Sequence, residues 1–207
     1  MFKRHFAFLT QMALKSIGPM RLPALLRDGN VKTFNLYTYT SETGSPISVL
    51  EYGKIRNPPL LRIHSACSFA HVFNSQRCDC KSQLDEALLR IVEDGGGLFI
   101  YLWGHEGRAV GLLNHTRVYM EQDRGKDTVS AYESLGLPVD SRDYSEAVEI
   151  LKKYGITSAR LLTNNPRKIE PLVRAGIDVR REPLIPILNP YNESQVRVKK
   201  EKLGHLL

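Results

Sequence analysis

The segment that most constrains this chain runs from Cys67 to Cys80 and reads CSFAHVFNSQRCDC. All three cysteines among the 207 residues lie in it: Cys67, Cys78 and Cys80. Thiolates are good zinc ligands, and three protein ligands leave the fourth tetrahedral position for water. Zinc lowers the pKa of a bound water to about 7, so hydroxide becomes available at neutral pH. The segment therefore predicts a catalytic site with one zinc ion per chain.

Other interpretations of the three cysteines stay open at this point. A structural zinc site would need a fourth ligand, which a histidine such as His71 could supply. Cysteines that bind no metal are a further possibility. A disulfide framework is disfavoured, because the count is odd and no apolar signal segment opens the sequence. We therefore expect a reducing, cytoplasmic environment.

The charge of the chain indicates the kind of partner. Twenty-nine lysines and arginines against 22 acidic residues give a net charge of +7, which favours an anionic partner. The basic residues are scattered, with short clusters at Arg180–Arg181 and Lys199–Lys202. Scattered charge favours a small anionic substrate over a nucleic-acid groove. No run of residues approaches the roughly 20 apolar positions of a membrane span. We expect neither nucleic acid nor a membrane as partner.

Apolar runs and turn residues predict strands that alternate with helices. The expected strands cover residues 32–40, 47–52, 60–64, 98–103 and 160–163. The expected helices follow Cys80, Arg108, Asp143 and Asn165. Asp143 and Glu146 form a capping box for the third helix. Asn165 is the expected N-cap of the fourth helix, with Pro166 in its first turn. For residues 2–26 we expect a helix packed on the body, with an amphipathic targeting segment as the alternative. This pattern implies an α/β fold with parallel strand pairs.

The strand at 60–64 delivers three chemically active side chains at its end. His64 is the last residue of this strand, and Ser65 and Cys67 lie one and three positions beyond it. Sheets of α/β proteins commonly hold functional residues at the ends of their strands. We therefore place the candidate site at this end of the sheet.

Several motifs, taken together, resemble the GTP cyclohydrolase II family. The metal segment begins with RIHSAC at 62–67 and ends with RCDC at 77–80. Further matches are EGR at 106–108, GLLN at 111–114, QD at 122–123, Gly125, DT at 127–128, LLTNNP at 161–166 with Lys168, and KLGHLL at 202–207. The resemblance implies one α/β domain over 1–207, a mixed sheet with helices packed on it. Residues 1–59 form its divergent N-terminal part and residues 60–207 its catalytic core.

The resemblance implies a zinc- and magnesium-dependent hydrolase that opens the imidazole ring of GTP. Formate leaves from C8 and pyrophosphate leaves from the triphosphate, which gives a diaminopyrimidine ribosyl phosphate, an intermediate of riboflavin synthesis. C8 of guanine is a poor electrophile, so attack needs a metal-activated hydroxide and a nearby acid or base. Magnesium is expected with the triphosphate, held mainly by phosphates and waters. A homodimer is also implied.

The family pattern assigns roles to particular positions. Tyr119 matches a tyrosine that assists ring opening, and Asp140 with Arg142 matches a pair used in phosphate chemistry. We expect Arg142 to act as an electrostatic clamp, because an always-charged guanidinium is a poor nucleophile. The alternatives are core packing for Tyr119 and an exposed ion pair for Asp140 and Arg142. Matches to substrate-binding positions of the family are Arg62, His64, Ser65, Gln83, Glu106, Gly107, Arg108, Thr128, Thr163 and Lys168.

The sequence departs from the family near the metal segment. Ala66 stands where the family usually has glutamate, Phe69-Ala70-His71 replaces Thr-Gly-Asp, and His105 replaces glutamine. His71 could close the zinc site and abolish catalysis. The pocket could accept another purine nucleotide or stop at the formamide. Ordinary activity could also be retained. The preserved Tyr119, Asp140, Arg142 and Lys168 disfavour a scaffold without catalysis.

A non-catalytic zinc module that binds RNA or a regulatory nucleotide is the competing class of function. Base-stacking surfaces need aromatic residues interleaved with lysine or arginine. Here the aromatic residues lie mostly in expected strands. The pattern therefore favours an enzyme.

Overall fold

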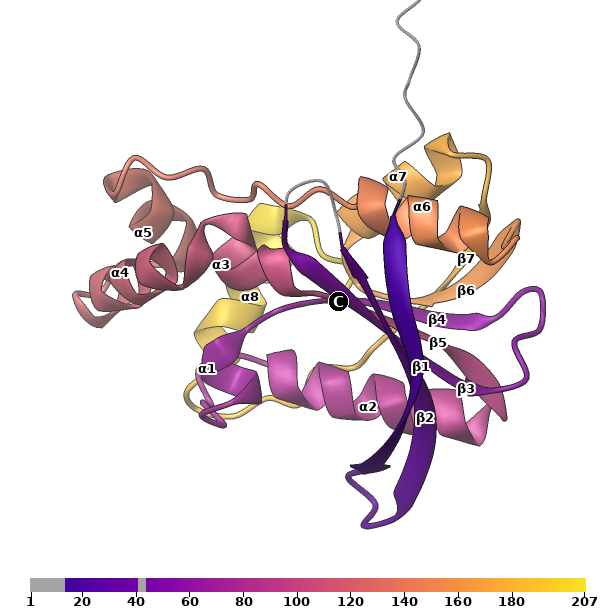
Figure 1. The fold of residues 1–207 in the computed structure, drawn as a ribbon. Coiled ribbons are helices and arrows are strands. Elements are labelled where there is room, and N and C mark those ends of the chain that lie inside the picture. The colour runs from indigo at the N-terminus through magenta and orange to yellow at the C-terminus, as the bar shows by residue number, and fades with distance from the viewer. Residues whose placement is uncertain (1–13, 41–43) are drawn as a thin grey trace, which may run out of the picture.

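The structure, a computed structural model, describes residues 14–40 and 44–207. Within these residues seven strands form one sheet in the order β1-β2-β3-β5-β4-β6-β7 (Figure 1). The strands are β1 Lys15–Leu25, β2 Val31–Thr40, β3 Pro46–Gly53, β4 Leu60–Ser65, β5 Gly96–Leu102, β6 Ser158–Leu162 and β7 Asp178–Glu182. Pairing is antiparallel from β1 through β3 to β5 and parallel among β5, β4, β6 and β7. The expected mixed sheet is confirmed.

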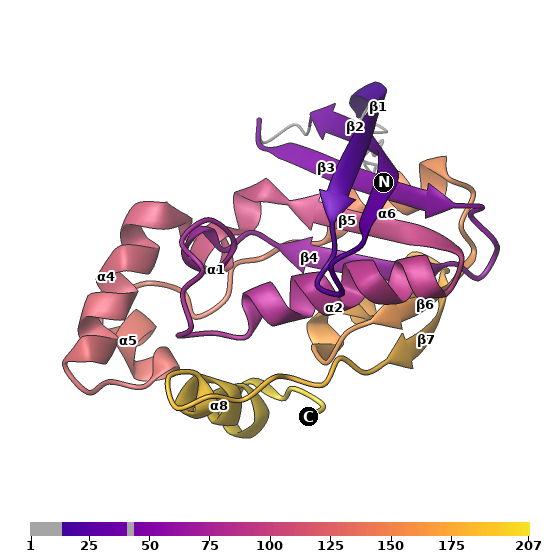
Figure 2. The ribbon, with the colours of Figure 1, turned by 90° about the horizontal axis from the view of Figure 1, so that it is seen from below.

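Helices cover both faces of this sheet. α2 lies on one face and α6 with α7 on the other, whereas α4 and α5 lie beyond the carboxyl ends of β4 and β5 (Figures 1 and 2). The α-helices are α1 Ser68–His71, α2 Cys80–Glu93, α3 Glu106–Ala109, α4 Gly111–Asp123, α5 Thr128–Ser134, α6 Ser145–Lys153, α7 Glu170–Arg174 and α8 Glu193–Leu203. The 3-10 turns are η1 Trp103–His105 and η2 Pro166–Lys168. This arrangement is the α/β class that the sequence pattern predicts.

The central strands β4 and β5 are buried on both faces. Alternate side chains of a strand point to opposite sides of the sheet. On one side the core joins these strands to α6 and α7 through Leu61, Ile63, Leu98, Ile100, Ile150 and Leu172. On the other side they pack against α2 through Leu60, Phe99, Ala87 and Ile91. Arg62 and His64 alternate with Leu61 and Ile63, so their side chains lie on the α2 side.

Truncation of this core gives the first testable prediction. Ile150 is fully buried between α6 and the sheet, at 0% exposure. Ile150→Ala is expected to lower the free energy of unfolding by about 2–5 kcal/mol, because it leaves a cavity as well as losing apolar burial. Urea unfolding measures the change. Leu113→Ala, at a side chain that is 79% exposed, is the control and should stay within about 0.5 kcal/mol of the unaltered protein. Equal stability of the two variants would contradict this packing.

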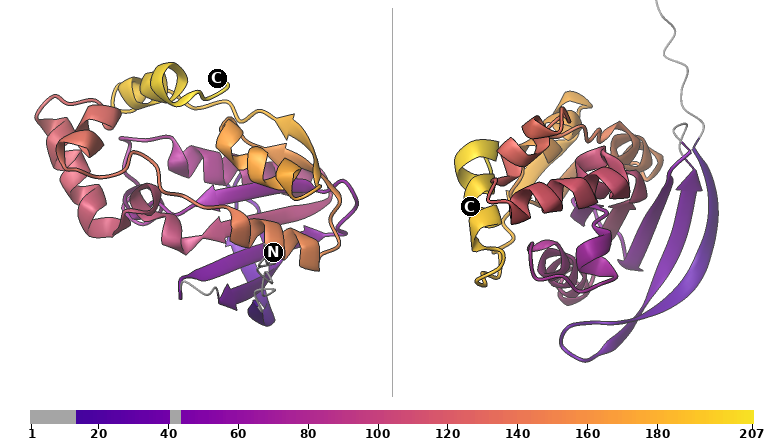
Figure 3. Two further views of the ribbon diagram at one scale, coloured as in Figure 1. Left: turned by 90° about the horizontal axis from the view of Figure 1, so that it is seen from above. Right: turned by 90° about the vertical axis from the view of Figure 1, so that its left-hand side faces the viewer.

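The expectation for residues 2–26 is wrong over Lys15–Leu25. This stretch is strand β1, paired antiparallel with β2 from Lys15↔Thr40 to Leu25↔Val31. The hairpin of β1 and β2 projects from the body at the edge of the sheet (Figure 3). Cross-strand backbone bonds to β2, the next strand along the chain, overrode the weak local helix signal. Residues 2–13 of that expectation lie outside the described residues.

Two helix starts were expected from capping patterns. Asn165 caps as expected, since its side chain accepts a hydrogen bond from the backbone N–H of Arg167 at 3.0 Å. The capping box of Asp143 is wrong, because α6 has Tyr144 at the N-cap position with no side-chain cap. The Asp143 carboxylate instead accepts hydrogen bonds from the backbone N–H, at 3.0 Å, and the hydroxyl of Ser145. Both contacts still order the chain that enters the helix.

Candidate active site

Three loops converge at the carboxyl ends of β5, β4 and β6. These strands are neighbours and parallel, with Ser65 of β4 level with Leu102 of β5. Parallel neighbours bring the segments that follow them to one edge of the sheet. The segment after β4 carries Cys67, that after β5 carries His105, and that after β6 carries Thr163. The site therefore lies where the strand-end pattern placed it.

One pocket at this edge brings together most of the side chains expected from the sequence. Those that line it are Arg62, His64, Ser65, Cys67, Cys78, Cys80, Gln83, Gly107, Arg108, Tyr119, Thr128, Arg142, Thr163 and Lys168. Glu106 and Asp140 stand behind the lining and contact residues that form it. Five further residues line the pocket although the sequence gave them no role in the site: Asp79, His115, Gln195, Lys199 and His205. The last three come from the C-terminal segment, where KLGHLL at 202–207 matches the family but gave no residue a role in the site.

The three cysteine thiols form one compact cluster. Their sulfur atoms all lie within 4.8 Å of one another, and Cys67 Sγ is 3.8 Å from Cys78 Sγ. Two thiolates at the Zn–S distance of about 2.3 Å in a tetrahedral site are separated by about 3.8 Å. Hydrogen bonds from Cys67 and Cys80 lower the pKa of the Cys78 thiol, whereas the bonds with Cys78 and Cys80 raise the pKa of the Cys67 thiol, so Cys78 loses its proton before Cys67 does. The donor set and its spacing fit zinc.

His71 lies beside the thiols but outside their cluster. Its Nδ1 is 2.8 Å from the Tyr101 hydroxyl and 3.3 Å from the backbone N of Cys67. Its Nε2 faces Nε2 of His64 at 3.2 Å. Both ring nitrogens therefore have protein partners, and the described residues group no histidine with the thiols. The geometry does not support His71 as a fourth ligand.

Tyr119 of α4 stands in an aromatic cluster next to the thiols. Its ring stacks on Phe69 with centroids 5.1 Å apart, and the Arg77 guanidinium lies 4.5 Å above it. The hydroxyl is buried, and no side-chain or backbone group of the described residues bonds it. Burial raises the pKa of Tyr119, so the hydroxyl keeps its proton. Since a buried hydroxyl normally finds a partner, this one is available to a ligand in the pocket.

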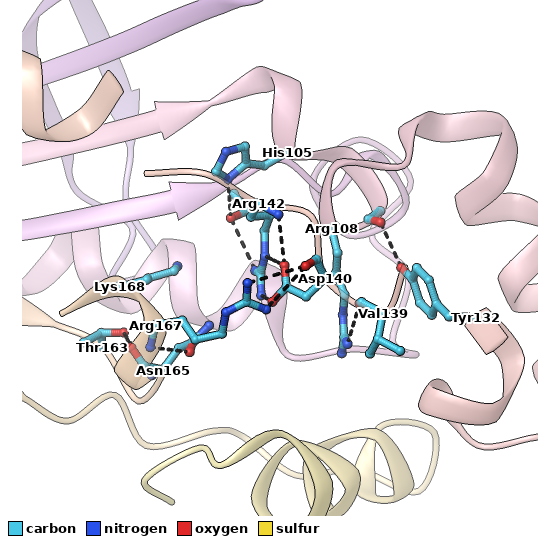
Figure 4. Close-up of polar contacts among 12 residues, drawn as sticks. His105, Arg108, Tyr132, Val139, Asp140, Arg142, Thr163, Asn165, Arg167 and Lys168 are labelled. Atoms are coloured by element: carbon cyan, nitrogen blue, oxygen red, sulfur yellow. Dashed lines mark hydrogen bonds and ion pairs between the residues drawn. The ribbon is translucent and has the colours of Figure 1, made fainter. Parts of the chain in front are cut away.

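Arg142 is fixed by a two-pronged ion pair with Asp140. Nε donates to Oδ1 at 2.8 Å and Nη2 donates to Oδ2 at 2.6 Å (Figure 4). Arg167 adds a second cation at 2.9 Å from Oδ2. Burial raises the pKa of Asp140, but the bond and charge of Arg142 more than offset it and hold it at about 2. The pair is largely buried, so the exposed ion-pair alternative is not supported.

Further cations surround Arg142. Arg108 donates to the carbonyl of Val139 at 3.2 Å, and Lys168 donates from Nζ to the carbonyl of Ile63 at 2.9 Å. Burial lowers the pKa of both side chains. Figure 4 shows Arg108, Arg142 and Lys168 on neighbouring segments of the site. An anionic group such as a phosphate would compensate this concentration of positive charge.

Arg62 has a different environment from the other cations. It is 3% exposed, and its guanidinium bonds Nδ1 of His64 at 3.2 Å, the carbonyl of Leu162 at 2.7 Å and Oε1 of Gln83 at 2.6 Å. Burial lowers its pKa to about 10. All of its guanidinium nitrogens already have protein acceptors. Arg62 therefore orders His64 and Gln83 within the pocket wall.

The EGR motif makes an unusual turn at the pocket. Gly107 and Arg108 have positive φ angles of 57° and 61°. A Cβ on Gly107 would lie 2.7 Å from Cβ of His115, so only glycine fits. The hydroxyl of Tyr132 donates to the carbonyl of Gly107 at 2.9 Å and holds the turn. The motif thereby directs Arg108 toward the pocket and Glu106 away from it.

The Glu106 carboxylate is fully occupied inside the protein. It accepts hydrogen bonds from the backbone N–H of Ser68 at 2.7 Å and from its hydroxyl at 2.6 Å, and it pairs with His115 Nδ1 at 2.6 Å. Burial raises the pKa of Glu106, but the bonds from His115 and Ser68 outweigh it and hold the pKa at about 2. These contacts fasten the start of α1 to α4.

This depressed pKa gives a prediction about pH. The contribution of Glu106 to stability is present above its ordinary pKa of 4.5 and is lost as the pH falls toward about 2. Glu106→Gln should lower the free energy of unfolding by about 1–3 kcal/mol at neutral pH. Urea unfolding between neutral pH and about pH 3 should show this difference shrinking. Glu133→Gln, at an exposed position, is the control. A difference that stays constant with pH would contradict the role of the ionised Glu106 carboxylate.

None of the helices in the described part of the chain is long and apolar enough to cross a membrane.

Known proteins are similar to this sequence over most of its length. The family model described as GTP cyclohydrolase II matches residues 25–183. Riboflavin biosynthesis protein RibBA of Aquifex aeolicus is 43% identical over 177 residues, which cover 84% of this chain and 44% of that protein. RibBA of Salinispora tropica is 46% identical over 199 residues, covering 96% and 49%. GTP cyclohydrolase-2 of Salmonella typhimurium is 43% identical over 199 residues, covering 95% and 99%. The chain thus spans about half the length of the RibBA proteins and almost all of the Salmonella protein.

Proposed function

The chain belongs to the GTP cyclohydrolase II family, and from this premise we propose that it is a hydrolase of riboflavin biosynthesis that acts on GTP. The reaction opens the imidazole ring of guanine, releases formate and pyrophosphate, and leaves a diaminopyrimidine ribosyl phosphate. One observation carries the proposal. The compact thiol cluster, the Tyr119 hydroxyl and the cations around Arg142 all line one pocket, and within residues 14–40 and 44–207 that hydroxyl has no hydrogen-bond partner.

Cys67, Cys78 and Cys80 would hold the zinc ion. Bound zinc supplies an activated water for attack at C8 and stabilises the charge that develops there. The protein excludes bulk water from this region, since two of the three thiols are buried and the third is partly buried. Cys67 is the N-cap residue of α1 and Cys80 is the first residue of α2, so two helices fix the spacing of the ligands.

Tyr119 is the candidate proton donor at the ring. Its hydroxyl keeps its proton, because burial raises its pKa, and it has no partner among the described residues. When the imidazole opens, the departing ring nitrogen needs a proton, which a positioned side chain can give. Stacking on Phe69 limits the movement of the phenol ring.

Arg142 would stabilise negative charge that develops at the α-phosphate while pyrophosphate leaves. Asp140 holds the guanidinium at two points, so it need not reorganise during the reaction. Arg108, Lys168 and the hydroxyls of Thr128 and Thr163 line the same pocket and can bind the remaining phosphate oxygens. Magnesium would enter with the triphosphate. Arg62 would support these contacts through Gln83 and His64.

The test is mass spectrometry of the products from zinc-loaded protein, GTP and magnesium, with a chelator-treated sample as control. A deformylated diaminopyrimidine phosphate with formate and pyrophosphate supports the proposal and makes Ala66, His71 and His105 tolerated changes. A ring-opened product that keeps its formyl group shows that the second hydrolysis is lost. No turnover of GTP with zinc bound overturns the proposal and directs the search to other purine nucleotides, and then to a non-catalytic zinc module.

We further propose a homodimer in the cytoplasm, with residues 1–207 as one domain. Light scattering on the purified chain measures the mass of the assembly against the 23.5 kDa of one chain. A mass near twice this value is expected, and a monomer at all concentrations would contradict the assembly.

A further inference from the structure

The C-terminal helix α8 forms part of the wall of the pocket. Gln195 and Lys199 of α8 and His205 just beyond it line the pocket beside the cysteine cluster. In Figures 2 and 3, α8 lies apart from the strands, next to α5. The site is therefore assembled from the last residues of the chain as well as from the strand ends.

Lys199 forms a buried ion pair with the residue between two of the thiols. Its Nζ bonds Oδ1 of Asp79, which separates Cys78 from Cys80. Asp79 is 1% exposed, and the Lys199 side chain is 11% exposed. A buried carboxylate next to thiolates is unfavourable unless a cation compensates its charge. Lys199 supplies that cation.

The same carboxylate is linked by hydrogen bonds to other residues of the pocket wall. Oδ2 of Asp79 accepts a hydrogen bond from Nε2 of Gln83 at 2.6 Å, and Oε1 of Gln83 accepts one from Arg62 at 2.6 Å. Asp79 thus joins the loop of the cysteines to α2 and β4. The side chains that bond this carboxylate in the described part of the chain are Gln83 and Lys199, and Lys199 comes from α8.

The end of α8 is anchored independently of this ion pair. The backbone N–H of Leu206 donates to the carbonyl of Asn164 at 2.8 Å, and Arg181 donates to the carbonyl of Leu206 at 3.3 Å. Lys202 pairs with Asp127 at the N-terminus of α5. These contacts hold α8 between α5 and the segment after β6, so they direct Lys199 to Asp79.

We propose that Lys199 is a positioning residue of the active site, which holds Asp79 and with it the loop that carries Cys78 and Cys80 in the arrangement that binds metal. The proposal deepens the proposed function and rests on its cysteine site. Lys199 does not touch the reacting atoms in this role. By holding Asp79, it keeps Cys78 and Cys80 in place, and through Asp79 and Gln83 it also orients Arg62.

The test compares Lys199→Met with two matched variants. Lys199→Arg keeps the cation, and Lys200→Met makes the same change at the exposed neighbour. Two readouts need no substrate: the rate at which a disulfide reagent modifies the thiols of the metal-free protein, and the rate at which the zinc-loaded protein loses zinc to a chelator. Lys199→Met should raise both rates about 10-fold or more, as for loss of a residue that orients metal ligands. The two matched variants should stay near the original rates.

Equal rates in Lys199→Met and Lys200→Met would overturn the proposal. If Lys199→Met does not fold, as thermal unfolding would show, Asp79→Asn combined with Lys199→Met removes both buried charges. That double variant should fold and still lose zinc faster, because nothing fastens the loop to α8. Retention of zinc at the original rate in the double variant overturns the proposal. A chain that turns over no GTP but shows the Lys199 effect would refute the proposed function and leave this inference intact.

Discussion

Replacing Cys78 by alanine is expected to remove zinc from the protein and to lower the turnover of GTP by more than about 100-fold. Replacing a residue that only orients a metal ligand already lowers metal affinity or activity by about 10- to 100-fold. Cys78 has the thiol whose pKa is lowered by its neighbours, and its sulfur is 3.8 Å from that of Cys67. Two remaining thiols cannot complete a three-ligand site. Elemental analysis of zinc per chain and chromatography of the products measure the two effects.

Val72→Ala is the control for this substitution. Val72 lies between Cys67 and Cys78 and is 72% exposed, so its truncation should leave zinc content and turnover unchanged. A Cys78→Ala protein that still holds one zinc ion per chain would refute the assignment of the ligands. Loss of zinc without loss of turnover would instead refute its catalytic role.

Replacing Arg142 by lysine should lower kcat by about 100- to 1,000-fold while zinc content stays at one per chain, as for the loss of one preorganised donor. Lysine keeps the positive charge and can still pair with Asp140, but it cannot bond both carboxylate oxygens and a phosphate in a fixed plane. The expected defect is therefore in the release of pyrophosphate. Enzymatic detection of pyrophosphate measures this step directly. Measurement of kcat and KM then separates a slower release of pyrophosphate, which lowers kcat, from weaker binding of GTP, which raises KM.

Arg117→Lys is the matched control for Arg142→Lys. Arg117 lies on α4, where it is exposed and donates to Asn114 at 3.0 Å. Its replacement should leave both kinetic constants unchanged. If Arg142→Lys retained full kcat, the clamp would have to be assigned to Arg108 or Lys168, the other cations of the pocket.

Glu106 and Arg62 were expected from their motifs to bind substrate, but in the structure both side chains bond protein groups. Both match substrate-binding positions, yet the Glu106 carboxylate is bonded to Ser68 and His115. The guanidinium of Arg62 is likewise bonded within the wall. A motif gives the type of residue and its place along the chain. The direction of a side chain depends on which partners are near it after folding.

The sequence alone determined the features that depend on short-range patterns. Apolar runs located β4 and β5, Asn165 with Pro166 located the turn after β6, and the spacing of the cysteines predicted a cluster that the structure contains. In each case neighbouring residues carry the information, because strand burial, capping and ligand spacing are local properties.

Only the tertiary structure decided the features that depend on distant partners. Residues Lys15–Leu25 form a strand because they pair along their length with β2, as far as Lys15↔Thr40. His71 is kept out of the thiol cluster because Tyr101 and His64 bond its ring. Lys199 and Asp79 are 120 residues apart in the chain. No local pattern marks such a pair, since the burial that makes it important arises when α8 packs beside the cysteine loop.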